Sequence, residues 1–442
     1  MPVTDFFLTA FDPSDLPGTS IDPLGFDRGY NFLADKILPG LTNVADRPRY
    51  FGMLCAGVVL AGADNSDPPL KLYSDRRDAV LRLERLWALA NVLASEEGLR
   101  ADGIRGISYV LEERRRLQRA GSTTASARFK LLSRQAPYGV LGIYGAIAEG
   151  LRFFVERKTF TLSPDAGDAL AHAFIDETQM PASVRRAVKD DTEVGMSVLA
   201  SWGKRAHISA SPAGEETRYL SEALHRNYVR SRTVQHLASI PPQPDEPELA
   251  RIRRIHRSIP DNCDDVDLKN AFEAILEFED CYRILMLGFE RLLWLCRSAT
   301  TAVLPHERFA HDKVVKKVCD LLPAAAKRLG RAFENGRTEH LRSEMERIED
   351  VLLFIDRAAT ISDNPSLLCK EMLARHNDVQ HAKFDRGRRK MPWVECVGGG
   401  LALTTTRAGG LNFEAQSPDE IAPHPYRLPA ADALLAVSIT AP

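Results

Sequence analysis

The sequence predicts a mainly α-helical protein with small strand content. Apolar residues recur at intervals of three and four along most of the chain, most clearly between Asp265 and Arg297, where they form one stripe of a long helix. Hydrophobic residues make up 44% of the chain and charged residues 27%, as is usual for folded globular proteins. Because 442 residues exceed the size of an ordinary domain, two or three domains that share an interface are expected.

The N-terminal half reads as a series of helices bounded by Pro, Gly or Asp, and these are expected near 27–37, 45–62, 74–97 and 107–119. The series stops at Ile240, where four prolines occur in eight residues and exclude a helix interior. We therefore expect an N-terminal helical domain over 1–239 and a linker over 240–264.

The C-terminal half is expected to form a helical bundle over 265–390. Between 338 and 360, apolar residues repeat every seven positions, a pattern typical of a bundle seam. The last bundle helix is expected to start with Ser362 or Asn364 as its cap. Beyond the bundle, residues 391–442 read as a short β-hairpin around Gly398, followed by a terminal helix near 429–437.

Several classes of site are not indicated by the sequence. The motif from His306 to His311 resembles HExxH, but its extra residue turns the two imidazoles about 140° apart on a helix and so disfavours zinc. No phosphate-binding glycine loop occurs, and we expect no metal and no cofactor. Single, scattered cysteines, a start without an export signal and short apolar runs indicate a cytoplasmic protein without membrane contact.

The first region that suggests a partner lies between Arg105 and Lys158. The stretch from 105 to 134 contains eight basic and only two acidic residues, although the formal charge of the whole chain is -2. A predicted helix, a hairpin and a capped helix start at Ser163 follow, in an order that resembles winged-helix DNA-binding domains. This resemblance implies a small winged-helix-like element near 122–175, with nucleic-acid contacts from Arg114, Arg115, Arg116, Arg128, Lys130, Arg157 and Lys158.

The helix that would read DNA in such an element, Val140–Ala148, is nearly all apolar and offers few groups for base edges. A winged helix that binds protein, or plain helix packing beside a solvated basic face, therefore explains the region equally well.

The second region follows the last bundle helix. Five positive charges occur within eight residues next to a tryptophan, which suits phosphate contact with base stacking. The expected nucleic-acid-binding residues here are Lys383, Arg386, Arg388, Arg389, Lys390 and Trp393.

The adjoining stretch from Arg375 to His381 resembles the Arg-polar-x-His motif of HEPN ribonucleases, which are all-helical and act without metal. This resemblance implies catalysis by Arg375 and His381, provided that the helix ends or bends near Gln380. The alternative is an ordinary helix surface on which Arg375 pairs with Asp378 and both His376 and His381 are exposed.

The opening segment, from Asp22-Pro-Leu-Gly through Leu38-Pro-Gly-Leu-Thr to Arg47-Pro-Arg-Tyr-Phe51, resembles the N-terminus of uncharacterised bacterial proteins often encoded near phage-defence or mobile-element genes. The resemblance implies a setting without a catalytic assignment. We therefore expect a non-catalytic, nucleic-acid-associated component of an antiviral defence or mobile-element system. Its expected partners are DNA or RNA and proteins encoded by neighbouring genes. The alternatives are a HEPN-like ribonuclease and a purely structural scaffold for protein interaction.

Overall fold

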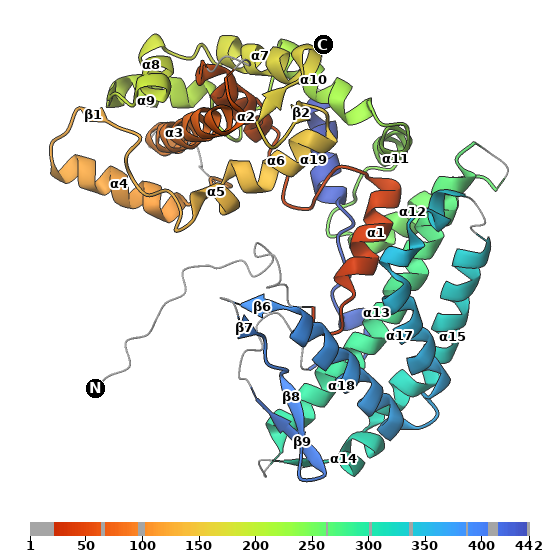
Figure 1. The fold of residues 1–442 in the computed structure, drawn as a ribbon. Coiled ribbons are helices and arrows are strands. Elements are labelled where there is room, and N and C mark those ends of the chain that lie inside the picture. Colours follow the sequence, from red (N-terminus) through yellow and green to blue (C-terminus); the bar gives the residue numbers. More distant parts are fainter. Residues whose placement is uncertain are drawn as a thin grey trace, which may run out of the picture. The chain divides into compact units, whose positions relative to one another are not determined.

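The computed structural model describes residues 22–62, 67–95, 102–261, 264–299, 303–335, 339–385, 388–404 and 414–439. Helices account for 67% of the described residues, and the strands are short (Figure 1). The mainly α fold that the sequence predicts is therefore confirmed. None of the described helices is long and apolar enough to cross a membrane.

The chain folds into two compact units. Among the described residues, unit 1 consists of residues 22–37 and 242–426, and unit 2 of residues 38–241 and 427–439. This division differs from the expected one near both ends of the chain and in the expected linker. Residues 22–37 belong with the C-terminal bundle, and the terminal helix belongs with the N-terminal half.

Unit 2 is built around two helices, α2 (Arg49–Leu60) and α3 (Pro69–Ser95). All residues of α2 from Arg49 to Val58 are buried, as expected for a helix surrounded by others. The helices that pack around this pair or connect to it are α4 (Ile107–Arg119), α5 (Gln135–Tyr138), α6 (Val140–Gly150), α7 (Ala169–Glu177), α8 (Ala182–Asp190), α9 (Met196–Arg205), α10 (Gly214–His225), α11 (Tyr228–Ser239) and α19 (Leu428–Ile439).

Close packing in unit 2 depends on a small residue where α9 crosses α3. A Cβ atom on Gly203 would lie 2.0 Å from the carbonyl oxygen of Ala90, so any side chain there would force the helices apart. The strands of this unit form two antiparallel pairs. β1 (Thr124–Ala125) pairs with β4 (Val194–Gly195), and β2 (Phe154–Glu156) pairs with β3 (Thr161–Leu162).

Unit 1 is a helical bundle centred on α13 (Val266–Ser298), the long helix expected over 265–297. Its other helices are α1 (Asp27–Ile37), α12 (Glu248–Ser258), α14 (His306–His311), α15 (Lys313–Asn335), α16 (Glu339–Arg342), α17 (Glu349–Thr360) and α18 (Pro365–Ala382). Helix α12 lies within the segment that the sequence suggested was a linker. Its Leu249, Ile252 and Ile255 are buried in a helix that contacts α13.

The expected bundle helix over 338–360 is interrupted. Glu344 adopts a left-handed φ of 65°, and a 3₁₀ turn at Met345–Arg347 separates α16 from α17. The heptad positions Leu341, Ile348 and Ile355 are nevertheless buried. The seven-residue pattern therefore predicted correctly which residues are buried, but it did not predict the break in the helix. Helix α18 begins as expected, because the Asn364 side chain accepts hydrogen bonds from the N–H groups of Ser366 and Leu367.

The strands of unit 1 form two small antiparallel sheets. β8 (Val394–Val397) and β9 (Gly400–Leu403) form the expected hairpin, whose turn contains Gly398 and Gly399 at positive φ. β5 (Leu304–Pro305) adds to the outer side of β9. A second pair joins β6 (Phe384–Asp385) to β7 (Arg388–Arg389), and a 3₁₀ turn at Pro418–Glu420 precedes the end of the unit.

Candidate functional site

The first candidate site is an exposed basic surface on α4 and the segment that follows it. Helix α4 buries Val110, Glu113 and Leu117 against the rest of unit 2. Its opposite side, spread over about a third of the helix circumference, carries exposed basic side chains. We define the α4 basic surface as Arg115, Arg116, Arg119, Arg128, Lys130 and Arg134, all of which are exposed.

Carboxylates neutralise only part of this surface. Arg116 binds the buried Glu113 at 2.7 Å, and Arg128 binds Asp191 at 3.0 Å. Arg115, Arg119, Lys130 and Arg134 have no ion pair with any residue that the structure describes. These four charges are therefore available to a partner in solution.

Two tyrosines accompany the free cations. The Lys130 ammonium lies 4.9 Å from the centre of the Tyr109 ring, and the Arg134 guanidinium lies 5.7 Å from that of Tyr138. Both rings are half-buried, so each has an accessible part beside a positive charge. Partly exposed aromatic rings next to cations suit contact with both the bases and the phosphates of a nucleic acid.

The segment expected to form a winged element has the predicted order of helix, hairpin and capped turn. The Ser163 hydroxyl accepts a hydrogen bond from the Gly167 N–H in a π-helical turn, Pro164–Asp168, that leads into α7. Helix α6, however, buries Val140, Tyr144 and Ile147 in unit 2. Its exposed positions include Ala146 and Glu149, which present no donor for base edges or phosphates.

The other predicted residues of this region lie away from the exposed face of α4. Arg157 and Lys158 occupy the turn between β2 and β3, where Arg157 is half-buried near Gly145 and Lys158 is exposed. Arg114 is half-buried on α4. Of the residues predicted here, Arg115, Arg116, Arg128 and Lys130 are the ones that the structure places on the α4 basic surface.

In the second predicted region, Lys383 and Trp393 are engaged within unit 1. Lys383 is half-buried, donates to the Asp22 carbonyl oxygen at 2.7 Å and has its pKa lowered by burial. Trp393 is half-buried and packs edge-on against His376 with ring centres 5.3 Å apart. Arg389 is exposed and Lys390 half-buried. Arg388 belongs to β7, and Arg386 lies outside the described residues.

The structure does not bring Arg375 and His381 to one site. Helix α18 continues to Ala382, past both residues, so side chains six positions apart point about 120° away from each other. Arg375 is only 12% exposed and donates to the Leu24 carbonyl at 2.8 Å and to Asp350 at 3.0 Å. His381 is exposed at the helix end.

The alternative interpretation of this stretch also needs correction. The carboxylate that pairs with Arg375 belongs to Asp350 of α17 and not to Asp378. His376 is fully buried, where its Nδ1 lies 2.9 Å from the Pro23 carbonyl oxygen and its Nε2 accepts from the Trp393 N–H at 2.8 Å. Burial lowers the pKa of His376 to about 4, so the ring is neutral and structural at neutral pH.

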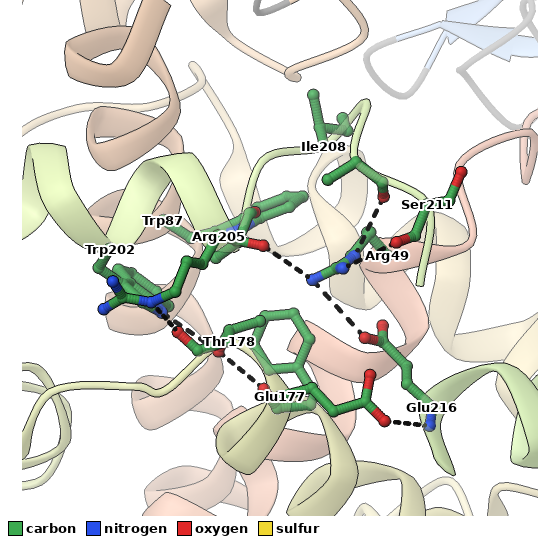
Figure 2. Close-up of polar contacts among 12 residues, drawn as sticks. Arg49, Trp87, Glu177, Thr178, Trp202, Arg205, Ile208, Ser211 and Glu216 are labelled. Atoms are coloured by element: carbon green, nitrogen blue, oxygen red, sulfur yellow. Dashed lines mark hydrogen bonds and ion pairs between the residues drawn. The ribbon is translucent and has the colours of Figure 1, made fainter. Parts of the chain in front are cut away.

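Sequence reasoning missed a buried polar cluster in unit 2 that surrounds Arg49 at the start of α2 (Figure 2). Its guanidinium donates to the carbonyl oxygens of Arg205, Ala210 and Ser211 at 3.2–3.3 Å, and thereby holds the loop of residues 206–213. Two side chains of α3 hold the same loop. The Trp87 indole donates to the Ala206 carbonyl at 2.6 Å, and the Asn91 side chain accepts from the Ile208 N–H at 2.7 Å.

Glu216 of α10 completes this cluster but is poorly partnered. It is fully buried, and neither carboxyl oxygen has a hydrogen-bond donor among the described residues. The nearest cation, Arg49, lies 3.6 Å away, beyond hydrogen-bond length. Burial raises the pKa of Glu216 to about 7, an effect that Arg49 opposes and the neighbouring Glu177 carboxylate reinforces.

Unit 1 contains a second buried cluster, centred on Glu279 of α13. Its carboxylate accepts hydrogen bonds from His424 through both the backbone N–H and Nδ1, and from the Tyr426 hydroxyl, at 2.6–3.2 Å. The His424 ring stacks on Tyr30 with centres 4.7 Å apart. Burial lowers the pKa of His424, but the charge and hydrogen bond of Glu279 outweigh burial and raise the pKa above its ordinary value.

No group of three or more His, Cys, Asp or Glu side chains with the geometry of a metal site occurs in the described part of the chain. The described residues offer exposed cations at the α4 basic surface and carboxyl groups in the two buried clusters. No family model, no curated protein and no solved structure matches this chain.

Proposed function

We propose that this protein is a non-catalytic, nucleic-acid-associated component of a bacterial anti-phage defence or mobile-element system, acting with proteins encoded by neighbouring genes. The resemblance of the segment from Asp22 to Phe51 supports the setting. The α4 basic surface supports the association with nucleic acid.

The observation that carries the proposal is a set of four exposed cations that have no ion pair with any described residue, Arg115, Arg119, Lys130 and Arg134. Cations of this kind bind phosphates mainly by releasing condensed counterions, and this gain depends little on base sequence. The half-buried Tyr109 and Tyr138 add ring surface beside two of the cations. A scaffold that binds only protein would not need this combination.

A ribonuclease reaction at Arg375 and His381 receives less support. A metal-independent ribonuclease needs a cation and a proton-transferring group at the same phosphate. Arg375 instead binds Leu24 and Asp350 inside unit 1, and the unbroken α18 directs His381 elsewhere.

The test is equilibrium binding of the purified protein to labelled single- and double-stranded DNA and RNA at 50 and 200 mM salt. With about four phosphate contacts, affinity should fall by on the order of a hundredfold between these concentrations. The triple variant R115E/K130E/R134E should weaken binding to every sequence alike and reduce the slope of log affinity against log salt by about three.

A matched control is R218E, which makes the same kind of charge change at an exposed residue of unit 2. Arg218 already shares its charge with Glu215 and Glu222, so binding should change little. Absence of binding to all four nucleic acids, or equal binding by the triple variant and the wild type, would reject the proposal in favour of a structural scaffold.

A further inference from the structure

The Glu216 carboxyl is inaccessible to solvent, and no residue that the structure describes donates a hydrogen bond to it. It rests against α2 beside Gly52, where a Cβ atom would come within 2.9 Å of Glu216 Oε1. The absence of a side chain at Gly52 therefore makes the room that the carboxyl occupies. A buried acceptor without a donor is rare in folded proteins and calls for a specific explanation.

A second carboxyl is directed at the same place. Glu177, at the end of α7, accepts a hydrogen bond from the Glu216 N–H at 2.8 Å through Oε1. Its Oε2 is inaccessible to solvent, has no donor among the described residues and is turned toward the Glu216 carboxyl (Figure 2). If both carboxyl groups are ionised, Glu177 Oε2 and both Glu216 oxygens lack donors among the described residues, and the two negative charges repel each other.

We propose that Glu216 and Glu177 share one proton, and that this proton keeps the start of α10 and the loop of residues 206–213 in place. A protonated Glu216 becomes the donor that Glu177 Oε2 lacks. The remaining charge, on Glu177, is the one held at the N-terminus of α10, where a helix favours an anion.

The loop depends on the proton through Arg49. With Glu216 neutral, Arg49 directs its N–H groups to the carbonyls of Arg205, Ala210 and Ser211. An ionised Glu216, 3.6 Å from the guanidinium, competes with those carbonyls because a charged acceptor attracts Arg more strongly than a neutral one. Loss of the proton therefore weakens the hold on the loop while it introduces repulsion at the start of α10.

The other charged groups around Glu216 do not replace the proton. Burial lowers the pKa of His207, and the positive charge of Arg49 lowers it further. The His207 ring is therefore neutral at neutral pH. Arg230 of α11 is committed to the carbonyls of Ala223 and Leu224 at the far end of α10. The remaining ionisable side chains on α10 and on the packed face of α19 are Glu215, Arg218, Tyr219, Glu222, His225 and Asp432, of which Glu215 and Glu222 pair with Arg218.

The experiment combines infrared spectroscopy with hydrogen exchange on the full-length protein. A carboxylic-acid C=O band should be present at pH 6, disappear as the pH rises through about 7 and be absent from the Glu216→Gln variant. A second such band is expected from Glu84, whose pKa burial raises to about 7, and E84Q identifies it. If no band is lost in E216Q, Glu216 is not protonated and the proposal fails.

Sharing is tested by Glu177→Gln, which removes the neighbouring charge but keeps the shape. The Glu216 band should then disappear at a lower pH than in the wild type, because an ionised neighbour no longer opposes ionisation. An unchanged midpoint would show that the two carboxyls do not share the proton.

The effect on the loop is read from amide exchange over 206–222, corrected for the intrinsic pH dependence. Protection of these amides should fall above pH 7 in the wild type and persist in E216Q. The control is E215Q, which changes an exposed neighbour and should lose protection as the wild type does. Equal loss of protection in the wild type and E216Q would overturn the role of the proton in holding the loop.

Discussion

Glu279 in unit 1 and Glu216 in unit 2 are both glutamates with fully buried side chains. Glu279 receives three hydrogen bonds, from His424 and Tyr426. Within the described part of the chain, Glu216 receives none on either oxygen and faces a second carboxyl group, that of Glu177. The same residue type is therefore buried with a full set of donors in one unit and without them in the other.

The difference shows that burial alone does not determine what a glutamate does. Burying a charge is tolerated when hydrogen bonds and an opposite charge replace water, as His424 and Tyr426 do for Glu279. Where hydrogen-bond donors and an opposite charge are missing, the neutral acid is the more stable form. The residue then binds a proton that it can release near neutral pH. Glu279 thus joins a C-terminal segment to α13, whereas Glu216 responds to pH.

The largest effect is expected from Glu279→Ala. This change leaves the His424 and Tyr426 donors buried without an acceptor, and removing one partner of a buried pair costs about 3–5 kcal/mol. Denaturant unfolding followed by circular dichroism measures the loss.

Glu277→Ala is the matched control, because Glu277 lies on the same helix and pairs with the exposed Arg328. Its removal should cost no more than about 1 kcal/mol. Similar losses for the two variants would mean that the three hydrogen bonds at Glu279 add nothing beyond an ordinary surface pair.

The second effect concerns the pH dependence of stability at Glu216. Its pKa is about 7 in the folded protein against an ordinary 4.5, so the folded state binds the proton more tightly than the unfolded state does. The resulting stabilisation is complete below pH 4.5 and is lost as the pH rises through 7. Relative to the wild type, Glu216→Gln should therefore gain about 2–3 kcal/mol of unfolding free energy between pH 5 and pH 8.

The measurement is a series of denaturant titrations of the two proteins at pH 5, 6, 7 and 8. A difference between wild type and E216Q that stays constant over this range would place Glu216 among the carboxylates that remain ionised, and would remove the contrast with Glu279.

Much of the fold could be predicted from the sequence, because helix periodicity and capping are local properties. The limits of α1 and α4 agree with the predicted 27–37 and 107–119, and Asn364 caps α18 as expected. The interruption at Glu344 was not predicted, because a seven-residue spacing of apolar residues indicates which positions are buried and does not show whether the helix is continuous. The grouping of residues 22–37 with the distant bundle depends on long-range packing, which no local pattern contains.

The basic surface was also visible in the sequence, since an excess of Arg and Lys around 105–134 needs only counting. The buried clusters were not. Arg49, Glu177 and Glu216 are far apart in the chain, and each reads as an ordinary charged residue in a helix. The one local sign was a charged residue at the start of the wholly apolar helix α2, where Arg49 would otherwise be expected at the surface.

The smallest effects on stability are expected at the two residues of the predicted ribonuclease motif. Arg375 is largely buried and hydrogen-bonded, whereas His381 is exposed, so their replacement should have different effects. Arg375→Ala removes hydrogen bonds to Leu24 and Asp350 and a contact with the Phe354 ring, and should cost about 2 kcal/mol. His381→Ala changes an exposed helix end and should alter stability by no more than about 0.5 kcal/mol.

Incubation with RNA in the presence of a chelator should give no cleavage with the wild type or with H381A. Cleavage that disappears in H381A while its stability is unchanged would instead assign His381 a catalytic role, in which case a dimer or a rearranged α18 would have to bring a cation to it.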